Sequence, residues 1–164
     1  MVMQLRAWCA STMMALPVLA GAQDTAAGPA SVWAADLVPV VRPSLAGSTL
    51  LAIAAEPTSA GDSLSPALAA ALAAAVGVPG AASLDLANLP ICVGSPESST
   101  PGERRGVIAS VRWHPGEAPN RGAVTVAVIC MMQGRPFSQG TTRPLVRGAD
   151  GRWAPDGPWA EWIS

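Results

Sequence analysis

The chain has 164 residues, enough for one ordinary domain, and 50% of them are apolar while 13% are charged, a composition that allows a buried core and excludes a disordered chain. The formal net charge is −1 and lysine is absent, which excludes a P-loop phosphate site and gives no positive field for nucleic acid or anionic membrane. We therefore expect neither nucleic acid nor a membrane surface as a partner.

Residues 1–22 have the three parts of a secretory signal peptide. A single cation, Arg6, precedes the apolar stretch 7–20, and a small-residue triplet ends at Ala22. As a helix the apolar stretch spans roughly 21 Å, short of the roughly 30 Å hydrocarbon layer, and Pro17 weakens it further. Cleavage after Ala22 predicts an extracytoplasmic protein, periplasmic or secreted, with no stable membrane insertion. An uncleaved anchor or a merely buried helix are the alternatives.

The first half of the mature chain predicts one strand and one helix. Residues 23–31 are rich in Ala, Gly and Pro and predict a flexible lead-in to a single domain over 32–164. The apolar run 48–55 predicts a strand. Ser65 followed by Pro66 predicts the N-cap and first turn of an Ala-rich helix that runs to Val76 and is closed by Gly77.

The second half predicts sheet. In 105–114, alternate residues are apolar, so we expect the set Val107, Ala109, Val111 and Trp113 to face the core. The run 123–133 is apolar on both faces, as in a central strand, and the Pro- and Gly-containing loop before it predicts an antiparallel hairpin. Further strands are predicted at 89–93, at 141–147 and, after a turn, near 152–153. The fold class is therefore α+β, with one Ala-rich helix packed on a mostly antiparallel curved sheet of four to five strands.

Two cysteines remain once Cys9 leaves with the predicted signal peptide. An even pair in an oxidising compartment predicts a disulfide between Cys92 and Cys130. Closing the loop of about 40 residues between these two cysteines would stabilise the fold by roughly 4 kcal/mol. A redox or metal pair is the alternative, but neither cysteine belongs to a Cys-x-x-Cys motif and no ligand cluster surrounds them. We predict no metal and no cofactor.

The segment Gly61-Asp62-Ser63-Leu64 resembles the nucleophile block of the GDSL family of lipolytic hydrolases. The resemblance implies that Ser63 attacks an ester carbonyl, with His114, the only histidine, as its available base. The family places Asp three residues before that histidine, whereas this chain has Val111 there. The alternative is a turn at Gly61 and Asp62, with Ser63 or Ser65 capping the helix.

The C-terminal tail concentrates aromatic and cationic side chains. Trp153, Trp159 and Trp162 lie within ten residues, and Arg143 and Arg147 precede them. Such a group predicts a surface that binds a sugar, a peptide or a partner protein. In the alternative reading, Trp153 closes the last strand while the other two indoles cover an open end of the sheet.

The leading functional hypothesis is a non-catalytic extracytoplasmic binding or cell-envelope accessory module whose partner is a protein or an envelope component. It depends on the predicted signal peptide, the single disulfide candidate and the lack of an assembled catalytic constellation. Two alternatives stay open. One is a small secreted serine hydrolase that uses Ser63 and His114, and the other is a secreted inhibitor or structural envelope module.

Overall fold

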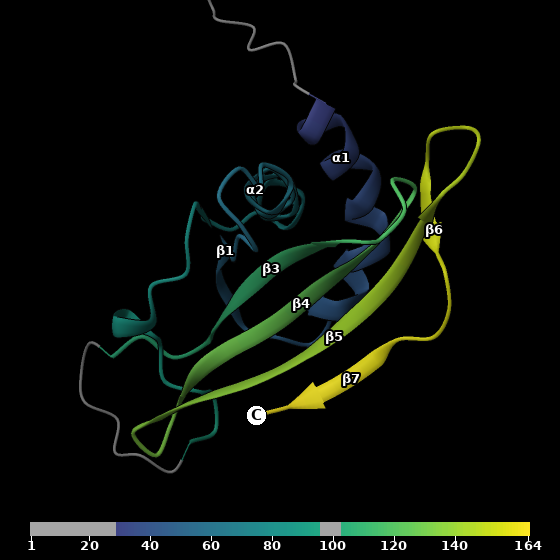
Figure 1. Ribbon diagram of the computed structural model, residues 1–164. Coiled ribbons are helices and arrows are strands. Elements are labelled where there is room, and N and C mark those ends of the chain that lie inside the picture. Colours follow the sequence, from purple (N-terminus) through teal and green to yellow (C-terminus); the bar gives the residue numbers. More distant parts are fainter. Residues whose placement is uncertain (1–28, 96–102) are drawn as a thin grey trace, which may run out of the picture.

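The computed structural model describes residues 29–95 and 103–164, so the predicted signal peptide and residues 23–28 lie outside the described residues. In this part of the chain two helices lie on one face of a seven-stranded open sheet (Figure 1). The helices are α1 (Pro29–Val41) and α2 (Leu64–Val76), with short 3-10 turns η1 (Arg42–Leu45) and η2 (Leu86–Asn88). The strands are β1 (Leu50–Ala55), β2 (Gly80–Ala81), β3 (Val107–Pro115), β4 (Arg121–Met132), β5 (Arg135–Arg147), β6 (Trp153–Pro155) and β7 (Ala160–Ile163).

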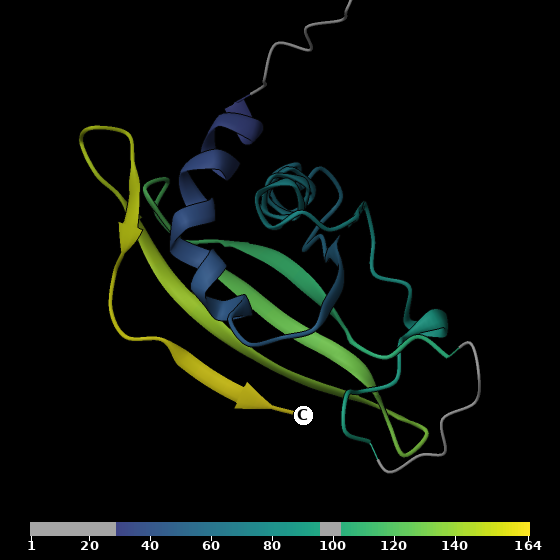
Figure 2. The ribbon, with the colours of Figure 1, turned by 180° about the vertical axis from the view of Figure 1, so that it is seen from behind.

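The strand order confirms the predicted α+β class and the central strand. The sheet runs β2-β1-β3-β4-β5, and both β6 and β7 pair with the outer edge of β5. The strands β3, β4 and β5 form an antiparallel meander, while β1 is parallel to β2 and β3. The long strands β3, β4 and β5 form a twisted sheet. Both helices pack on the face of this sheet that is turned toward the viewer in Figure 2. The described sheet therefore has seven strands where four to five were predicted.

The helix α1 corrects two predictions. It begins at Pro29, so residues 29–31 are helical rather than part of a flexible lead-in, and the described chain has two helices rather than one. Proline suits the first turn of a helix because an N–H there would have no intrahelical partner. Ala34, Leu37 and Val41 have spacings of three and four and are fully buried. This apolar stripe packs against α2 and the sheet and stabilises a segment of low charge.

The Ala-rich helix α2 is confirmed, but its N-cap is not the predicted one. Gly77 ends the helix in the left-handed conformation, with its amide bonded to the carbonyl of Ala73. At the other end, the Asp62 carboxylate accepts from the amides of Leu64 and Ser65, at 3.0 and 3.1 Å. Asp62 therefore supplies the cap, because it precedes the helix and reaches the free amides of the first turn.

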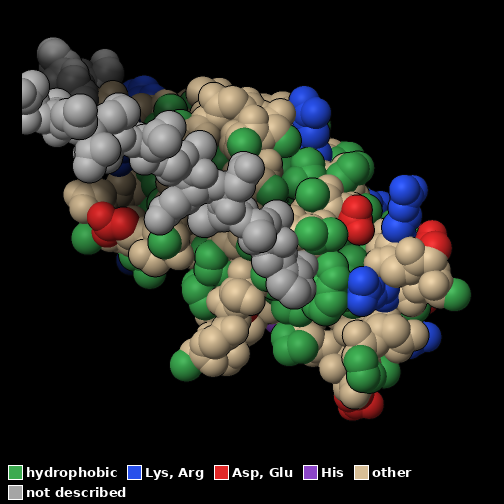
Figure 3. Space-filling view, turned by 90° about the horizontal axis from the view of Figure 1, so that it is seen from above, with side chains coloured by type: hydrophobic (Ala, Val, Ile, Leu, Met, Phe, Trp, Pro, Cys, Tyr) green, Lys and Arg blue, Asp and Glu red, His purple; other side chains and the backbone are tan. Residues whose placement is uncertain are grey.

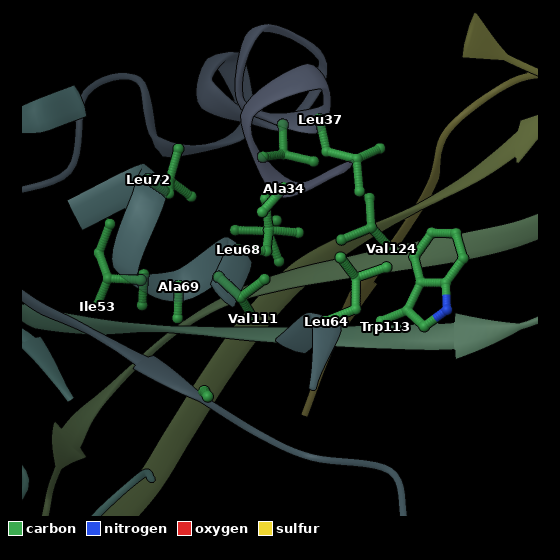
Figure 4. Close-up of a cluster of buried hydrophobic side chains, with 14 of the residues drawn as sticks. Ala34, Leu37, Ile53, Leu64, Leu68, Ala69, Leu72, Val111, Trp113 and Val124 are labelled. Carbon is green, nitrogen blue, oxygen red and sulfur yellow. The ribbon is translucent and has the colours of Figure 1, made fainter. Parts of the chain in front are cut away.

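The core lies between the helices and the sheet. Figure 4 shows Leu68 of α2 pointing into the space between α1 and Val111 of β3. Ala109, Val111 and Trp113 are buried there, which confirms the predicted core face of β3 except at Val107, which is half-buried. A second part of the core is aromatic and is formed by Trp33, Trp113 and Trp153. Trp153 packs edge-on against Trp33 and Trp113, with ring centroids 6.4 and 5.0 Å away.

One predicted strand boundary and one predicted strand are wrong. β5 begins at Arg135 rather than at 141, because Gln133 and Gly134 both have positive φ, 53° and 70°, and form a two-residue hairpin turn. The strand predicted at 89–93 reduces to single bridges of Ile91 with neighbouring segments. The short return after β5 is confirmed as β6.

The cysteine prediction is confirmed at the level of geometry. The sulfur atoms of Cys92 and Cys130 are 2.10 Å apart, and both residues are buried. The bond ties the long loop before β3 to the end of β4, where the Cys92 amide also donates to the Met131 carbonyl. A disulfide is consistent with an extracytoplasmic location. No helix in the described residues is long and apolar enough to cross a membrane.

Candidate functional site

The sheet face opposite the helices, which is turned toward the viewer in Figure 1, carries a hollow of about 310 Å³. Its lining comes from β3, β4 and β5, with one residue that follows β1 and one from β7. The lining residues are Glu56, Ser110, Arg112, His114, Thr125, Ala127, Ile129, Ser138, Thr142 and Trp162. We call this hollow the open-face pocket.

The shape of the open-face pocket follows from strand register. Ser110, Ala127, Gly140 and Trp162 lie opposite one another on four adjacent strands. Three of these residues are small, so the sheet surface is low along this row. Trp162 leans over Gly140, where an added Cβ would lie 2.8 Å from the indole and 2.9 Å from the Cβ of Ala127. Glycine at this position therefore lets the indole form one wall of the pocket.

The next row of the pocket is polar. Arg112, Thr125 and Thr142 are register partners, and the two threonine hydroxyls are hydrogen-bonded at 2.9 Å. The Thr125 hydroxyl also lies 3.0 Å from Nε2 of His114. Arg112 forms an ion pair with Glu56, so the formal charges of these two lining residues cancel.

His114 is held mainly in its neutral form. Burial lowers the pKa of His114 below its ordinary value of 6.5, the positive charge of Arg112 lowers it further, and the negative charge of Asp62 opposes the shift. At neutral pH the imidazole is therefore uncharged, and the open-face pocket has no formal net charge.

The pH dependence of stability tests this state. Because the folded-state pKa is depressed, His114 contributes no penalty above pH 6.5 and destabilises the fold as pH falls through 6.5 toward the folded-state pKa. We expect the free energy of unfolding, measured by urea denaturation, to decrease between about pH 7.5 and 5.5. His114 is the only histidine, so the decrease should be largely absent in His114→Gln, which can still bond to Thr125. An unchanged slope in this variant would contradict the assignment.

Two serines in the described residues are buried, and they differ in the hydrogen bonds that their hydroxyls form. The Ser65 hydroxyl both donates and accepts: it donates to Asp62 at 2.6 Å and accepts from the Trp113 amide at 2.9 Å. Burial raises the pKa of the Asp62 carboxyl, but the hydrogen bonds that it accepts from Ser65 and Thr58 outweigh this effect and lower the pKa below its ordinary value.

Ser110 is 1% exposed and lines the open-face pocket, yet within the described residues nothing hydrogen-bonds to its hydroxyl. This hydroxyl is not one of the fully enclosed side-chain atoms without a partner in the described residues, so it stays accessible from the pocket. The pocket therefore has one hydroxyl, that of Ser110, open to a ligand, and one enclosed donor without a partner in the described residues, Nε of Arg112.

The residues predicted to form one aromatic and cationic surface are divided between the two faces. Trp153 is 6% exposed and belongs to the core. The Arg143 guanidinium lies 3.6 Å from the Trp159 ring and donates to the Val40 carbonyl near the end of α1. Arg147 lies against Trp33 and donates to the Gly151 carbonyl. Only Trp162 of the predicted set lines the open-face pocket.

The structure does not join Ser63 and His114 by a hydrogen bond. Ser63 is exposed at the start of α2, and no hydrogen bond to its side chain is found in the described residues. Nε2 of His114 is instead engaged with Thr125. The neighbouring acid, Asp62, is occupied by Ser65 and Thr58 and acts as the helix cap.

Two larger hollows, of about 540 and 590 Å³, lie beside η1 on the helix side. Their one side-chain hydrogen bond joins Thr141 to Ser44, and neither hollow contains a buried hydroxyl without a partner or a pair of opposite charges.

In residues 29–95 and 103–164, no three His, Cys, Asp or Glu side chains form a group that could hold a metal ion. Comparison with protein-family models, with curated proteins and with solved structures found no match.

Charge is not concentrated by sign on the part of the surface seen from above. There Arg and acidic side chains are interspersed at one end of the molecule (Figure 3). Among the described residues, Nη1 of Arg121 on β4 also lies 2.6 Å from Oδ2 of Asp156, which follows β6. This surface offers no extended field of one sign.

Proposed function

We propose that the protein is a non-catalytic binding module of an extracytoplasmic compartment, periplasmic or secreted, and that the open-face pocket is its binding site. The single observation that carries the site assignment is the Ser110 hydroxyl, which lines the pocket, stays accessible from it and makes no hydrogen bond to a described residue. A bound ligand would supply the missing hydrogen bond.

Three further features support a binding role. The pocket combines an apolar wall at Trp162 with polar groups at Thr125 and Thr142, as small-molecule sites do. It lies on long paired strands, whose rigidity suits recognition. The predicted signal peptide and the Cys92–Cys130 disulfide favour a compartment outside the cytoplasm.

Chemical-shift mapping with a defined panel tests the proposal. The panel contains chitobiose, glutamate, arginine, inorganic phosphate and trialanine, each at about 10 mM so that Kd values near 1 mM are detected. At least one member should shift the amides of Ser110 and Thr125. The shifts should disappear in Thr142→Phe, which fills the pocket, and persist in Gln139→Phe, which places the same side chain on the opposite face of β5. A panel in which no compound shifts these amides would overturn the site.

Ester turnover tests the non-catalytic part of the proposal. Wild type and Ser63→Ala should hydrolyse p-nitrophenyl acetate at the same rate, because Ser63 has no hydrogen-bonded base in the described structure. A rate that falls in Ser63→Ala would favour the secreted hydrolase instead.

A further inference from the structure

We propose that the open-face pocket binds an uncharged sugar residue, free or at the end of a glycan. This inference rests on the proposed function and adds the chemical class of the ligand. The charge, the hydrogen-bonding groups and the apolar wall of the pocket favour this class.

The charges of the pocket lining favour a neutral ligand. The only formally charged lining residues are Arg112 and Glu56, and they are paired with each other. An anionic ligand that took Arg112 would leave the Glu56 carboxylate without its partner, and a cationic ligand would do the same to Arg112. The intact pair still presents guanidinium donors beside carboxylate oxygens, which can serve neighbouring hydroxyls of a neutral ligand.

The hydroxyls of the pocket favour a ligand that carries hydroxyl groups. The Ser110 hydroxyl has a donor and two acceptor sites that no described residue uses, and the Thr142 hydroxyl has Thr125 as its one partner. Each of these oxygens can donate or accept, depending on its partner. Ligand hydroxyls have the same freedom, whereas carboxylates only accept and ammonium groups only donate.

The apolar wall of the pocket favours a ring that can pack against an indole. Trp162 is half-buried and lies against Gly140 and Ala127, next to the hydroxyl row. A sugar ring offers C–H groups to an indole while its hydroxyls point sideways, so it can meet the wall and the row together. The volume of about 310 Å³ is at the lower end of the roughly 300–1,000 Å³ found for ligand pockets, which fits one sugar ring rather than a long chain.

The test compares two buried serines. Glucose, N-acetylglucosamine and chitobiose are titrated into wild type, Ser110→Ala and Ser65→Ala, with glutamate and arginine as charged probes. Ser110→Ala should weaken sugar binding about tenfold, equivalent to one lost hydrogen bond, and should leave the urea midpoint unchanged or higher. Ser65→Ala should lower the urea midpoint, because it removes two hydrogen bonds, and should retain sugar affinity at a temperature where it is folded.

The outcomes separate the ligand class from the site. If glutamate or arginine shifts the open-face amides and no sugar does, the sugar inference is overturned while open-face binding stands. If no probe shifts them, both proposals fail. Unchanged sugar affinity in Ser110→Ala, or a loss of stability equal to that of Ser65→Ala, would show that the Ser110 hydroxyl does not serve a sugar.

Discussion

Replacing Trp153 with alanine is expected to lower the free energy of unfolding by about 3–5 kcal/mol, the range for large aromatic side chains removed from cores. Trp153 is 6% exposed and lies between Trp33 of α1 and Trp113 of β3. Its removal would leave a cavity shared by a helix and two strands. Urea denaturation followed by far-UV circular dichroism measures the change without depending on the removed fluorophore.

Two variants serve as controls for this prediction. Trp153→Phe should cost less than Trp153→Ala, because it keeps a ring in the core and removes an indole N–H without a hydrogen-bond partner in the described residues. Trp159→Ala should cost about 1–2 kcal/mol, since the half-exposed ring is held mainly against Arg143. A greater loss for Trp159→Ala than for Trp153→Ala would contradict the placement of these two residues.

Removing the Cys92–Cys130 bond is expected to destabilise the protein by about 4 kcal/mol, because it frees the unfolded chain from a loop closed across 38 residues. The double variant Cys92→Ala/Cys130→Ala and the reduced wild type should unfold at similar, lower urea concentrations. The effect should be large because the bond holds the segment 82–95, whose only regular element is the short turn η2.

Intact-mass analysis of the exported protein provides the control. Alkylation of Cys92 and Cys130 only after reduction, in a chain that begins at Gln23, is the expected result and would also support the predicted signal peptide. Free thiols at both positions in protein purified without reductant would contradict the bond. Retention of Met1 would contradict cleavage of the leader.

The sequence predicted best the elements whose pattern is local. The strands β3 and β4 were predictable because the alternation of β3 and the continuous apolar run of β4 are both local patterns. The helix α2 was predictable from its run of Ala and Leu and from Gly77. The helix α1 was not predictable, because Pro39 inside it is an unfavourable signal and its stability comes from packing against α2.

The candidate site was less predictable for a different reason. His114 and Trp162 were singled out as residues, but their pocket depends on the pairing of β3, β4, β5 and β7, which a single sequence does not reveal. Ser110 was assigned to the face of β3 opposite the core, where a serine is unremarkable. Its own low exposure and the absence of a hydrogen bond to its hydroxyl in the described residues distinguish it.

The split covering of β5 has a consequence for aggregation. This strand has 13 residues, and its outer edge is paired by two short segments, β6 and β7, that flank Pro158. Short edge strands with proline and a central charge, here Glu161, are poor templates for strands of other molecules. A chain shortened before Trp153 would expose a long, regular edge instead. We therefore expect the last twelve residues, 153–164, to keep the protein monodisperse in concentrated solution.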